Sequence, residues 1–505
     1  GIFDCVHLKA NPLDCSPEMS LHKSSTFAVN RSRADMTNVD LAAIHAWVEE
    51  QWESHALSSL ADFIEIPALS PAFDDEWAAN GYLDDTIDLF LGWLGTLPME
   101  GMSCNVHRLE GRTPVLTITI EGTGDGEVLF YSHLDKQPPF TGWSEGKGPW
   151  IPVREDPWLF GRGSVDDGYG GYLSILSILA LQQHGISHPK ATFLIETCEE
   201  SGSFDLPAYL DELSDVLGTP DLVVVMDSGA GDYERLWVTT SLRGLVGGTL
   251  KVGVSQEGVH SGMAGGIIPS SFRIARSIIS RIEDESTGEV LLPELSINIS
   301  DDIRREAQGI ANVLGEKVWT DLPALDGVEP QTPGLAEIIL SGNWRPSLSV
   351  TGADGMPALK DAGNVLRTHT SLKLSMRIPP GVDANVAEAA MTSVLELDAP
   401  HGAHVSFTPD AAANGFSAPL MDPTFREALN TASLATFGNP MQVFFEGGTI
   451  PFLAMMQEKY PNANFLVTGS LGPGGNAHGP DEKLHIPATK AVTTCLAAAI
   501  ASLNI

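Results

Sequence analysis

Hydrophobic positions in the first half of the chain follow two periodicities. Apolar residues three or four positions apart predict helices, whereas short apolar and β-branched runs predict strands. The strand-like runs are VLTITIEG (115–122), EVLFYSHLD (127–135), KATFLIETC (190–198) and PDLVVVMDSG (220–229). A helix is predicted between the second and third runs, over residues 170–185. Strands that alternate with helices are typical of an α/β domain with a mainly parallel central sheet.

The pattern changes near residue 242. Strands are predicted at 242–254, 346–352, 370–379 and 403–409, and helices begin near residues 270 and 384. The order strand–helix–strand–strand–helix–strand predicts a small α+β domain of the ferredoxin-like kind. The polar stretch 285–335 is predicted to be an irregular insertion.

Helix and strand alternation returns after residue 410. We therefore expect a catalytic domain formed by residues 36–241 and 411–505, interrupted by an inserted domain at 242–410. Residues 1–35 lack apolar periodicity and the apolar core of a signal peptide. Met36 precedes TNVD, a good helix-capping sequence. We interpret residues 1–35 as an extension outside the fold and Met36 as the natural start.

Composition and charge exclude several classes of partner. The chain has 505 residues, with 29 Lys and Arg against 65 Asp and Glu, and a net charge of −36. Such an acidic surface repels phosphate backbones and anionic lipid, so we expect no nucleic-acid or membrane partner. The five cysteines are scattered and show no C-x-x-C spacing. This argues against a disulfide framework and favours a cytoplasmic location.

Five short stretches end a predicted strand or form a glycine-rich turn, and each carries a potential metal ligand. They are YSHLD (131–135), GRGSVDDGYGG (161–171), ETCEESGS (196–203), VVVMDSG (223–229) and GGNAHGPDEKL (474–484). The candidate ligands are His133, Asp166, Glu200, Asp227 and His478. Each stretch alone also fits an ordinary turn or helix cap. Four of them fall at strand ends, where a parallel sheet collects functional residues.

Imidazole and carboxylate are ligands that zinc and related divalent ions accept. Two histidines and three carboxylates suffice for two ions if one carboxylate bridges them, and paired ions activate water for hydrolysis. Zinc is the favoured metal, with manganese or cobalt as alternatives. Glu199 adjoins Glu200 at a predicted strand end, where adjacent side chains point in opposite directions and can take different roles.

The motifs together resemble the M20 metallopeptidases, a group of enzymes with two catalytic zinc ions. The matching elements are S-H-L-D, G-R-G-S-V-D-D-G, E-E-S-G-S, an Asp that closes a buried strand, H-S-G, E-G-G-T-I-P and A-H-G-P-D-E. They occur in family order and cover nearly everything after Met36. The run W-R-P-S-L-S and the long inserted domain are most similar to the carnosinase-like dipeptidase branch.

The resemblance implies a role for each candidate ligand. His133 and Asp227 would hold one metal, Glu200 and His478 the other, and Asp166 would bridge them through a loop with a cis Asp166–Asp167 peptide. Asp135 would orient His133. Glu199 would be the general base, taking a proton from the water that bridges the metals and passing it to the leaving nitrogen.

The resemblance also implies substrate contacts and a homodimer through the inserted domain, which would act as a lid. His260 of H-S-G would steady the oxyanion, from the same subunit or from its partner. Arg377 would grip a substrate carboxylate. Asn364 would contact the tetrahedral intermediate, and Gly447 and Gly448 would let the backbone approach the substrate.

One departure lies beside the bridging ligand. Carnosinase-like enzymes usually read D-D-K-G where this chain has Asp167-Gly168-Tyr169-Gly170, a change expected to alter the substrate pocket.

The sequence thus predicts a hydrolase that cleaves a peptide bond next to a free carboxylate, as a dipeptidase or carboxypeptidase acting on small peptides. An N-acyl amino acid deacylase or carbamoyl amidohydrolase on the same scaffold is the alternative. A non-catalytic metal-binding protein is a more distant one, because it predicts lost ligands or a lost base and neither loss is seen.

Overall fold

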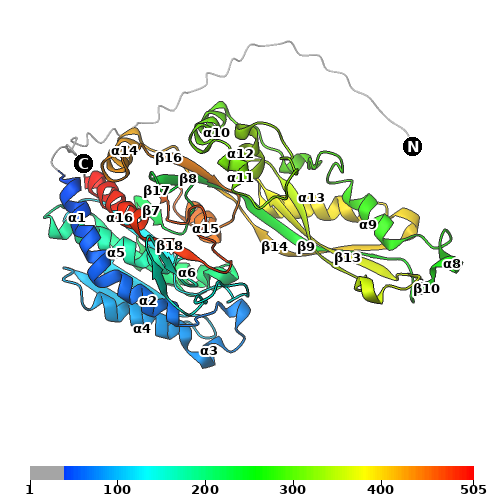
Figure 1. Cartoon of the computed structure of the whole chain (residues 1–505), viewed down its shortest axis with the longest axis horizontal. Helices are drawn as coiled ribbons and strands as arrows, with labels where there is room; N and C mark the ends of the chain where they lie inside the picture. The colour runs from blue at the N-terminus through cyan, green and yellow to red at the C-terminus, as the bar shows by residue number, and fades with distance from the viewer. Residues whose placement is uncertain (1–38, 505) are drawn as a thin grey trace, which may run out of the picture.

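A nine-stranded sheet organises the larger of two lobes (Figure 1). The computed structural model describes residues 39–504, so the predicted extension at 1–35 and the proposed start at Met36 lie outside the described residues. The strand order is β1-β2-β6-β3-β7-β17-β8-β15, with β16 also paired to β8. The strands are β1 (Met102–His107), β2 (Val115–Ile120), β3 (Glu127–His133), β6 (Lys190–Glu196), β7 (Leu222–Val225), β8 (Trp237–Leu242), β15 (Phe416–Ser417), β16 (Gln442–Glu446) and β17 (Asn464–Val467).

The sheet is mixed rather than mainly parallel. Its four central strands, β6, β3, β7 and β17, are mutually parallel. The flanking pairs β1–β2, β2–β6, β17–β8 and β8–β15 are antiparallel. The short connection from His107 to Val115 allows only an antiparallel pair, because a parallel one needs a long crossover. The prediction of a mainly parallel sheet is therefore correct for the centre, whereas the flanks are mostly antiparallel, with β16 parallel to β8.

Helices cover both faces of this sheet. Alternate strand residues point to opposite faces, so Phe130 packs in one apolar cluster and Leu129 in the other. The helices of this lobe are α1 (Leu41–Gln51), α2 (Leu57–Glu65), α3 (Trp77–Asn80), α4 (Tyr82–Leu94), α5 (Gly168–Gln183), α6 (Leu206–Glu212), α7 (Ser214–Leu217), α14 (Pro423–Phe437), α15 (Pro451–Lys459) and α16 (Ile486–Ala501). Helix α5 is buried on all sides from Gly168 to Leu181, which explains its continuous apolar sequence.

The smaller lobe is built on a four-stranded antiparallel sheet in the order β11-β13-β9-β14. Its strands are β9 (Gly244–Gly253), β11 (Ser347–Asp354), β13 (His369–Ile378) and β14 (His404–Ala413). Helices α9 (Ser271–Ile279) and α13 (Ala384–Glu396) bury residues such as Ile278 and Met391 against one face. The chain order and strand order are those of the predicted ferredoxin-like domain.

The stretch predicted to be irregular, 285–335, is irregular in part but also contains two α-helices. It contains α10 (Asp301–Leu314) and α11 (Lys317–Thr320), and α12 (Leu335–Asn343) follows. Ala307, Ile310, Ala311 and Leu314 are spaced to share one face of α10, and they pack in the apolar cluster of the large lobe. The prediction was wrong because the charged residues of DDIRRE obscure this narrow apolar stripe.

The sheets of the two lobes are joined at a narrow crossing. Strand β8 ends at Leu242 and β9 begins at Gly244, so Arg243 alone separates the two sheets. The returning connection, from β14 to β15, passes close beside it. A Cβ atom on Gly244 would lie 2.5 Å from the carbonyl oxygen of Ala413, and one on Gly415 would lie 2.7 Å from that of Leu242. Only glycines allow so close a crossing.

Two small sheets complete the described chain. One contains β4 (Val153–Glu155), β5 (Trp158–Phe160) and β18 (Lys483–His485). The other pairs β10 (Val259–His260) with β12 (Val365–Leu366), next to the short helix α8 (Ser261–Ala264). Between residues 39 and 504 no helix has the length and apolar character needed to cross a membrane.

Candidate metal centre and substrate site

Four of the predicted site residues lie at the carboxyl ends of three neighbouring parallel strands. Strand β3 ends at His133, and β7 ends two residues before Asp227. Strand β6 ends at Glu196, just before Glu199 and Glu200. Because the carboxyl ends of parallel strands meet at one edge of a sheet, the fold itself brings these side chains together.

Glu199 and Glu200 lie in a 3-10 turn (η4, Glu199–Ser201), not on the strand as predicted. The carboxylate of Asp135 holds this turn, because Oδ1 accepts from the amide of Glu199 at 3.1 Å and Oδ2 accepts from that of Glu200 at 3.0 Å. The two side chains still point to different partners, Glu199 towards His133 and Glu200 towards His478. Their different directions come from the turn that Asp135 holds and not from the alternation of side chains along a strand.

His133 is the centre of one group of ligand atoms. Its Nε2 lies 3.4 Å from Asp166 Oδ1, 3.7 Å from Asp227 Oδ2 and 4.0 Å from Glu199 Oε2. Its Nδ1 lies 3.2 Å from the carbonyl oxygen of Asp135 and 3.4 Å from Asp135 Oδ1. Asp135 therefore lies where it can fix the ring orientation and leave Nε2 facing the carboxylates.

His478 is the centre of a second group. Its Nε2 lies 2.9 Å from Asp166 Oδ2 and 3.3 Å from Glu200 Oε2. Asp166 thus directs one oxygen towards each histidine and stands between the two groups. Gln137, which sequence reasoning missed, donates from Nε2 to Glu200 Oε2 at 2.6 Å and orients that carboxylate. The peptide between Asp166 and Asp167 is cis.

Four carboxylates share this small, largely buried space with two imidazoles. Burial and the charge of Asp166 raise the pKa of Asp227 to about 7. Burial also raises the pKa of Glu199 well above its usual range, and Asp227 and Glu200 add to the shift. Hydrogen bonds to Asp166 and Glu200 raise the pKa of His478 to about 11. The site therefore attracts positive charge.

The donor set fits divalent metal ions. Two three-residue groups, His133–Asp166–Glu200 and His133–Glu199–Asp227, each have ligand atoms within 4.8 Å of one another. Within the described chain, the buried His133 Nε2 and Glu200 Oε1 atoms make no hydrogen bond. Unpartnered buried polar atoms are costly, and a cation bound among these carboxylates would satisfy both.

A buried ion pair connects the Asp166 loop to the His478 loop. Arg162 donates from Nη1 to Glu482 Oε2 at 2.5 Å and from Nη2 to the carbonyl oxygen of Gly479 at 2.9 Å. Glu482 Oε1 accepts from the amides of Gly163 at 2.9 Å and Val165 at 3.2 Å. The predicted motif A-H-G-P-D-E contains Glu482, but the sequence does not show that its partner is Arg162.

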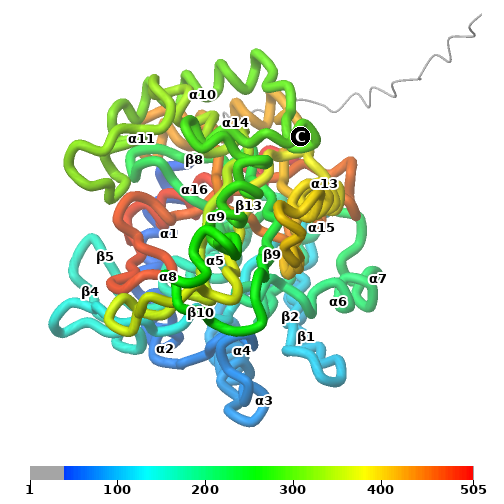
Figure 2. Tube along the Cα trace, turned by 90° about the vertical axis from the view of Figure 1, so that its right-hand side faces the viewer, coloured from blue at the N-terminus to red at the C-terminus, as the bar shows by residue number. Residues whose placement is uncertain are grey.

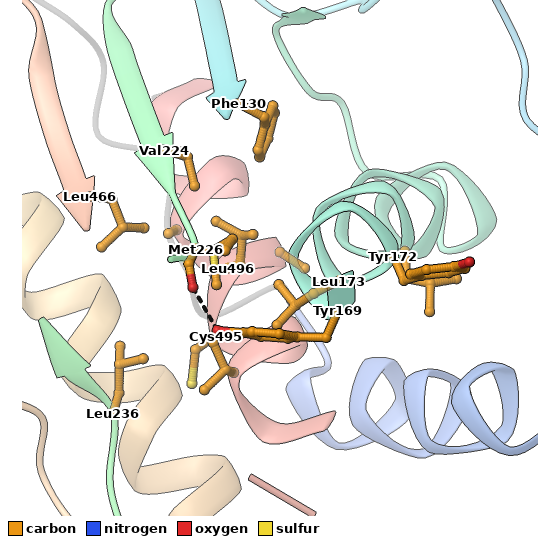
Figure 3. Close-up of a cluster of buried hydrophobic side chains, with 14 of the residues drawn as sticks. Phe130, Tyr169, Tyr172, Leu173, Val224, Met226, Leu236, Leu466, Cys495 and Leu496 are labelled. Atoms are coloured by element: carbon orange, nitrogen blue, oxygen red, sulfur yellow. Dashed lines mark hydrogen bonds between the residues drawn. The ribbon is translucent and has the colours of Figure 1, made fainter. Parts of the chain in front are cut away.

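Tyr169, the departure noted beside Asp166, points into the core and not into a substrate pocket (Figure 3). Its hydroxyl donates to the carbonyl oxygen of Met226 at 2.5 Å and accepts from the amide of Ser470 at 2.8 Å. Met226 immediately precedes Asp227. The expected effect on the pocket is therefore not seen, and Tyr169 instead ties helix α5 to the loop that presents Asp227.

Arg377 lies beside a second arginine that sequence reasoning missed. Arg377 donates to Thr449 Oγ1 at 3.0 Å, while Arg243 donates to Ser347 Oγ at 2.9 Å and to the carbonyl oxygen of Gly447 at 3.4 Å. No carboxylate of residues 39–504 forms an ion pair with either guanidinium. Burial and the charge of Arg377 lower the pKa of Arg243 to about 10. The two cations lack an anionic partner.

The paired glycines differ in what requires them. A Cβ atom on Gly447 would lie 3.0 Å from both Arg243 Nη2 and the carbonyl oxygen of Gly342, so internal packing already demands glycine there. A Cβ atom on Gly448 would meet nothing within 4 Å. Gly448 is the glycine of this pair whose surroundings leave room for a substrate.

His260 and Asn364 lie together but away from the metal centre. The amide of Ser261 donates to the carbonyl oxygen of Asn364 at 2.8 Å, and β10 pairs with β12. Both side chains are exposed. Figure 1 places β10 and α8 at the end of the small lobe that is remote from β7, the neighbour of β3, and Figure 2 looks onto that end. Within one chain, neither residue reaches the candidate ligands.

Comparison with known proteins gives a family match and several relatives. Peptidase family M20/M25/M40 matches residues 129–502. The cysteinylglycine-S-conjugate dipeptidase of Corynebacterium striatum is 25% identical over 375 residues, 72% of this chain and 78% of that protein. The Beta-Ala-His dipeptidase of Homo sapiens is 26% identical over 375 residues, 71% of each protein.

Solved structures match the fold. Human carnosine dipeptidase 1 superposes with a TM-score of 0.73 at 20% identity, covering 94% of this chain and all of that one. The Sulfolobus solfataricus structure titled an M20 family metallo-carboxypeptidase superposes with a TM-score of 0.71 at 19% identity, covering 88% of this chain and 99% of that one. The predicted fold class, an α/β domain with an inserted α+β domain, is confirmed.

Glu482→Gln should weaken both folding and metal binding. Removing one charge of a buried pair costs about 3–5 kcal/mol, because Arg162 is left uncompensated. The looser ligand loops should lower metal affinity by roughly 10–100-fold. Thermal unfolding and calorimetric titration with Zn²⁺ measure the two effects. The double variant R162M/E482L, which removes both charges, should lose less stability. Unchanged metal affinity in Glu482→Gln would show that the pair does not position the ligands.

Tyr169→Phe should lower Tm and metal affinity together. The ring is kept, but Met226 and Ser470 lose their shared hydroxyl partner, at a cost of about 1–3 kcal/mol. Tyr172→Phe is the matched control on the same helix, because it removes a buried hydrogen bond to Ser59 that lies away from the ligands. The control should lower Tm alone. Equal metal affinities in the two variants would exclude a role for Tyr169 in positioning Asp227.

Proposed function

This chain belongs to peptidase family M20/M25/M40 and is a hydrolase, as its motifs predicted, and we propose that it is a dipeptidase or carboxypeptidase. The substrate is a small peptide cleaved at the bond next to its free carboxylate. The observation that carries this proposal is the set of two histidines and four carboxylates gathered in one site, together with two arginines that form no ion pair within residues 39–504. The names of the two relatives, both dipeptidases, support it.

Divalent metal ions are implied by the family, and we propose two of them, with zinc favoured over manganese or cobalt. His133 and Asp227 would hold one ion, Glu200 and His478 the other, and Asp166 both. Such ions would polarise the peptide carbonyl and lower the pKa of water.

Glu199 is the proposed general base. Its carboxylate lies 4.0 Å from His133 Nε2 and forms no hydrogen bond with another group in residues 39–504. It is thus free to take a proton from the attacking water and pass it to the leaving nitrogen. Its main chain is fixed by Asp135, so the carboxylate needs little reorganisation during the reaction.

The arginine pair is the proposed anchor for the free carboxylate of the substrate. Two half-buried guanidiniums without an acidic partner repel each other, and one carboxylate between them would relieve that repulsion. Arg377 was predicted for this role, and we add Arg243.

The position of His260 supports a homodimer in which this residue serves the partner's site. Met263, Ile267 and Leu359, near His260 at the same end of the lobe, are 73%, 80% and 95% exposed. Exposed apolar residues gathered at one place are typical of an interface. A lid role for the inserted domain and a cytoplasmic location also stay predictions. The three cysteines within residues 39–504 are free thiols, in keeping with such a location.

Glu199→Ala should reduce kcat by about 10²–10⁴-fold, the usual contribution of a general base, and keep its metal. Hydrolysis of unblocked dipeptides, N-acyl amino acids and N-carbamoyl amino acids is measured with Zn²⁺, Mn²⁺ and Co²⁺, and metal content is measured in parallel. Glu212→Ala, an exposed site on α6, is the control. Near-normal kcat in metal-loaded Glu199→Ala would exclude this base.

The same panel separates the candidate activities. Preference for unblocked dipeptides supports the proposal, whereas preference for the blocked substrates selects the deacylase or carbamoyl hydrolase. No hydrolysis of any substrate by the metal-loaded wild type, with fewer than two ions per chain, would favour the non-catalytic alternative.

Mixing two inactive variants tests the dimer. His260→Ala and Glu199→Ala chains should each be nearly inactive, but a mixed dimer contains one site with both Glu199 and His260 intact. Refolding an equimolar mixture should therefore restore about a quarter of wild-type activity, since half of the dimers are mixed and each has one intact site. A monomer by analytical ultracentrifugation, or no recovery from a mixture shown to contain mixed dimers, would contradict the proposal.

A further inference from the structure

A cavity of about 910 Å³ lies between helices α10, α11 and α12 and the large lobe. One wall is helical and apolar, formed by Ile310 and Leu314 of α10, Val318 of α11 and Ile339 of α12. The opposite wall includes Phe444 and Leu471. The volume lies within the range of sites that bind small molecules, roughly 300–1,000 Å³.

The large-lobe wall of the cavity is made by the loops that carry the candidate site. Gly229 lies two residues after Asp227, and Gly474 lies four residues before His478. Gly447 lines the cavity and is in contact with Arg243. The cavity is therefore lined by the same loops that carry Asp227 and His478, and by a glycine that accepts a hydrogen bond from Arg243.

The charged groups around the cavity give it little preference for a charged ligand. Lys317 and Asp321, at the two ends of α11, carry opposite charges. The carboxylate of Glu446 already accepts from Ser228 Oγ at 2.8 Å. Most of the other side chains that line the cavity are apolar, and an apolar side chain of the substrate gains most from entering it because it leaves water.

We infer that this cavity is a specificity subsite that takes a bulky apolar side chain of the substrate. This inference rests on the proposed peptidase function and names its substrate class. Helices α10, α11 and α12 then have a task beyond packing, because they supply the wall that selects the substrate.

Val318→Phe tests the subsite by filling it. The peptides Gly-Gly, Gly-Phe and Phe-Gly are compared by kcat/KM with the metal-loaded enzyme. The wild type should prefer at least one Phe peptide over Gly-Gly by about 10-fold or more, and Val318→Phe should lose most of that preference while keeping Gly-Gly hydrolysis. The peptide that is affected identifies the substrate residue whose side chain enters the cavity.

Val328→Phe is the matched control, because the same replacement is made at a residue that is 53% exposed and does not line the cavity. If Val318→Phe does not fold, Val318→Ala should raise kcat/KM for Trp peptides relative to Phe peptides. Equal rates for all peptides in the wild type, or equal losses for all peptides in Val318→Phe, would overturn the inference. Failure of the metal-loaded wild type to cleave any peptide would instead overturn the proposed function.

Discussion

Mutual repulsion of carboxylates is the constraint on which this site depends. Asp166, Glu199, Glu200 and Asp227 lie close together in a largely buried space, where like charges repel strongly. Such an arrangement persists only if the backbones that carry the side chains are held independently of them. Strand β7 leads directly to Asp227, Asp135 holds the turn of Glu199 and Glu200, and the Arg162–Glu482 pair connects the loop of Asp166 to that of His478. The stability of the large lobe thus holds together groups that would otherwise move away from one another.

Much of this could be predicted from sequence, because the relevant signals are local. Strand ends with His133 and Asp227 are visible as apolar runs that finish in a polar residue, and parallel pairing then brings them together without further information. The ferredoxin-like order of strands and helices in the inserted domain could be predicted for the same reason. The helices of the 285–335 stretch were not, because a narrow apolar stripe on α10 lies among charges.

The missed residues act through partners distant in the chain. Arg162 and Glu482 are 320 residues apart in the chain. The role proposed for Arg243 depends on its position beside Arg377, which sequence spacing does not show. The change at Tyr169 was expected to alter the substrate pocket, yet the direction of its side chain depends on how α5 packs against β3 and on the hydrogen bond to Met226, after β7. Contacts of this kind are set by tertiary structure, which periodicity and motif spacing do not encode.

The crossing beside Arg243 has a mechanical consequence. Two of the connections between the lobes cross at Gly244 and Gly415, so a rotation of the small-lobe sheet against the large lobe would have its axis near them. Arg243 lies beside that axis, whereas His260 lies at the end of the small lobe that is farthest from it. In such a rotation the arginine pair would be displaced little, while the end of the small lobe that carries His260 would be displaced most. A peptide bound by its carboxylate at the arginine pair could therefore stay in place while groups at the far end of the small lobe move.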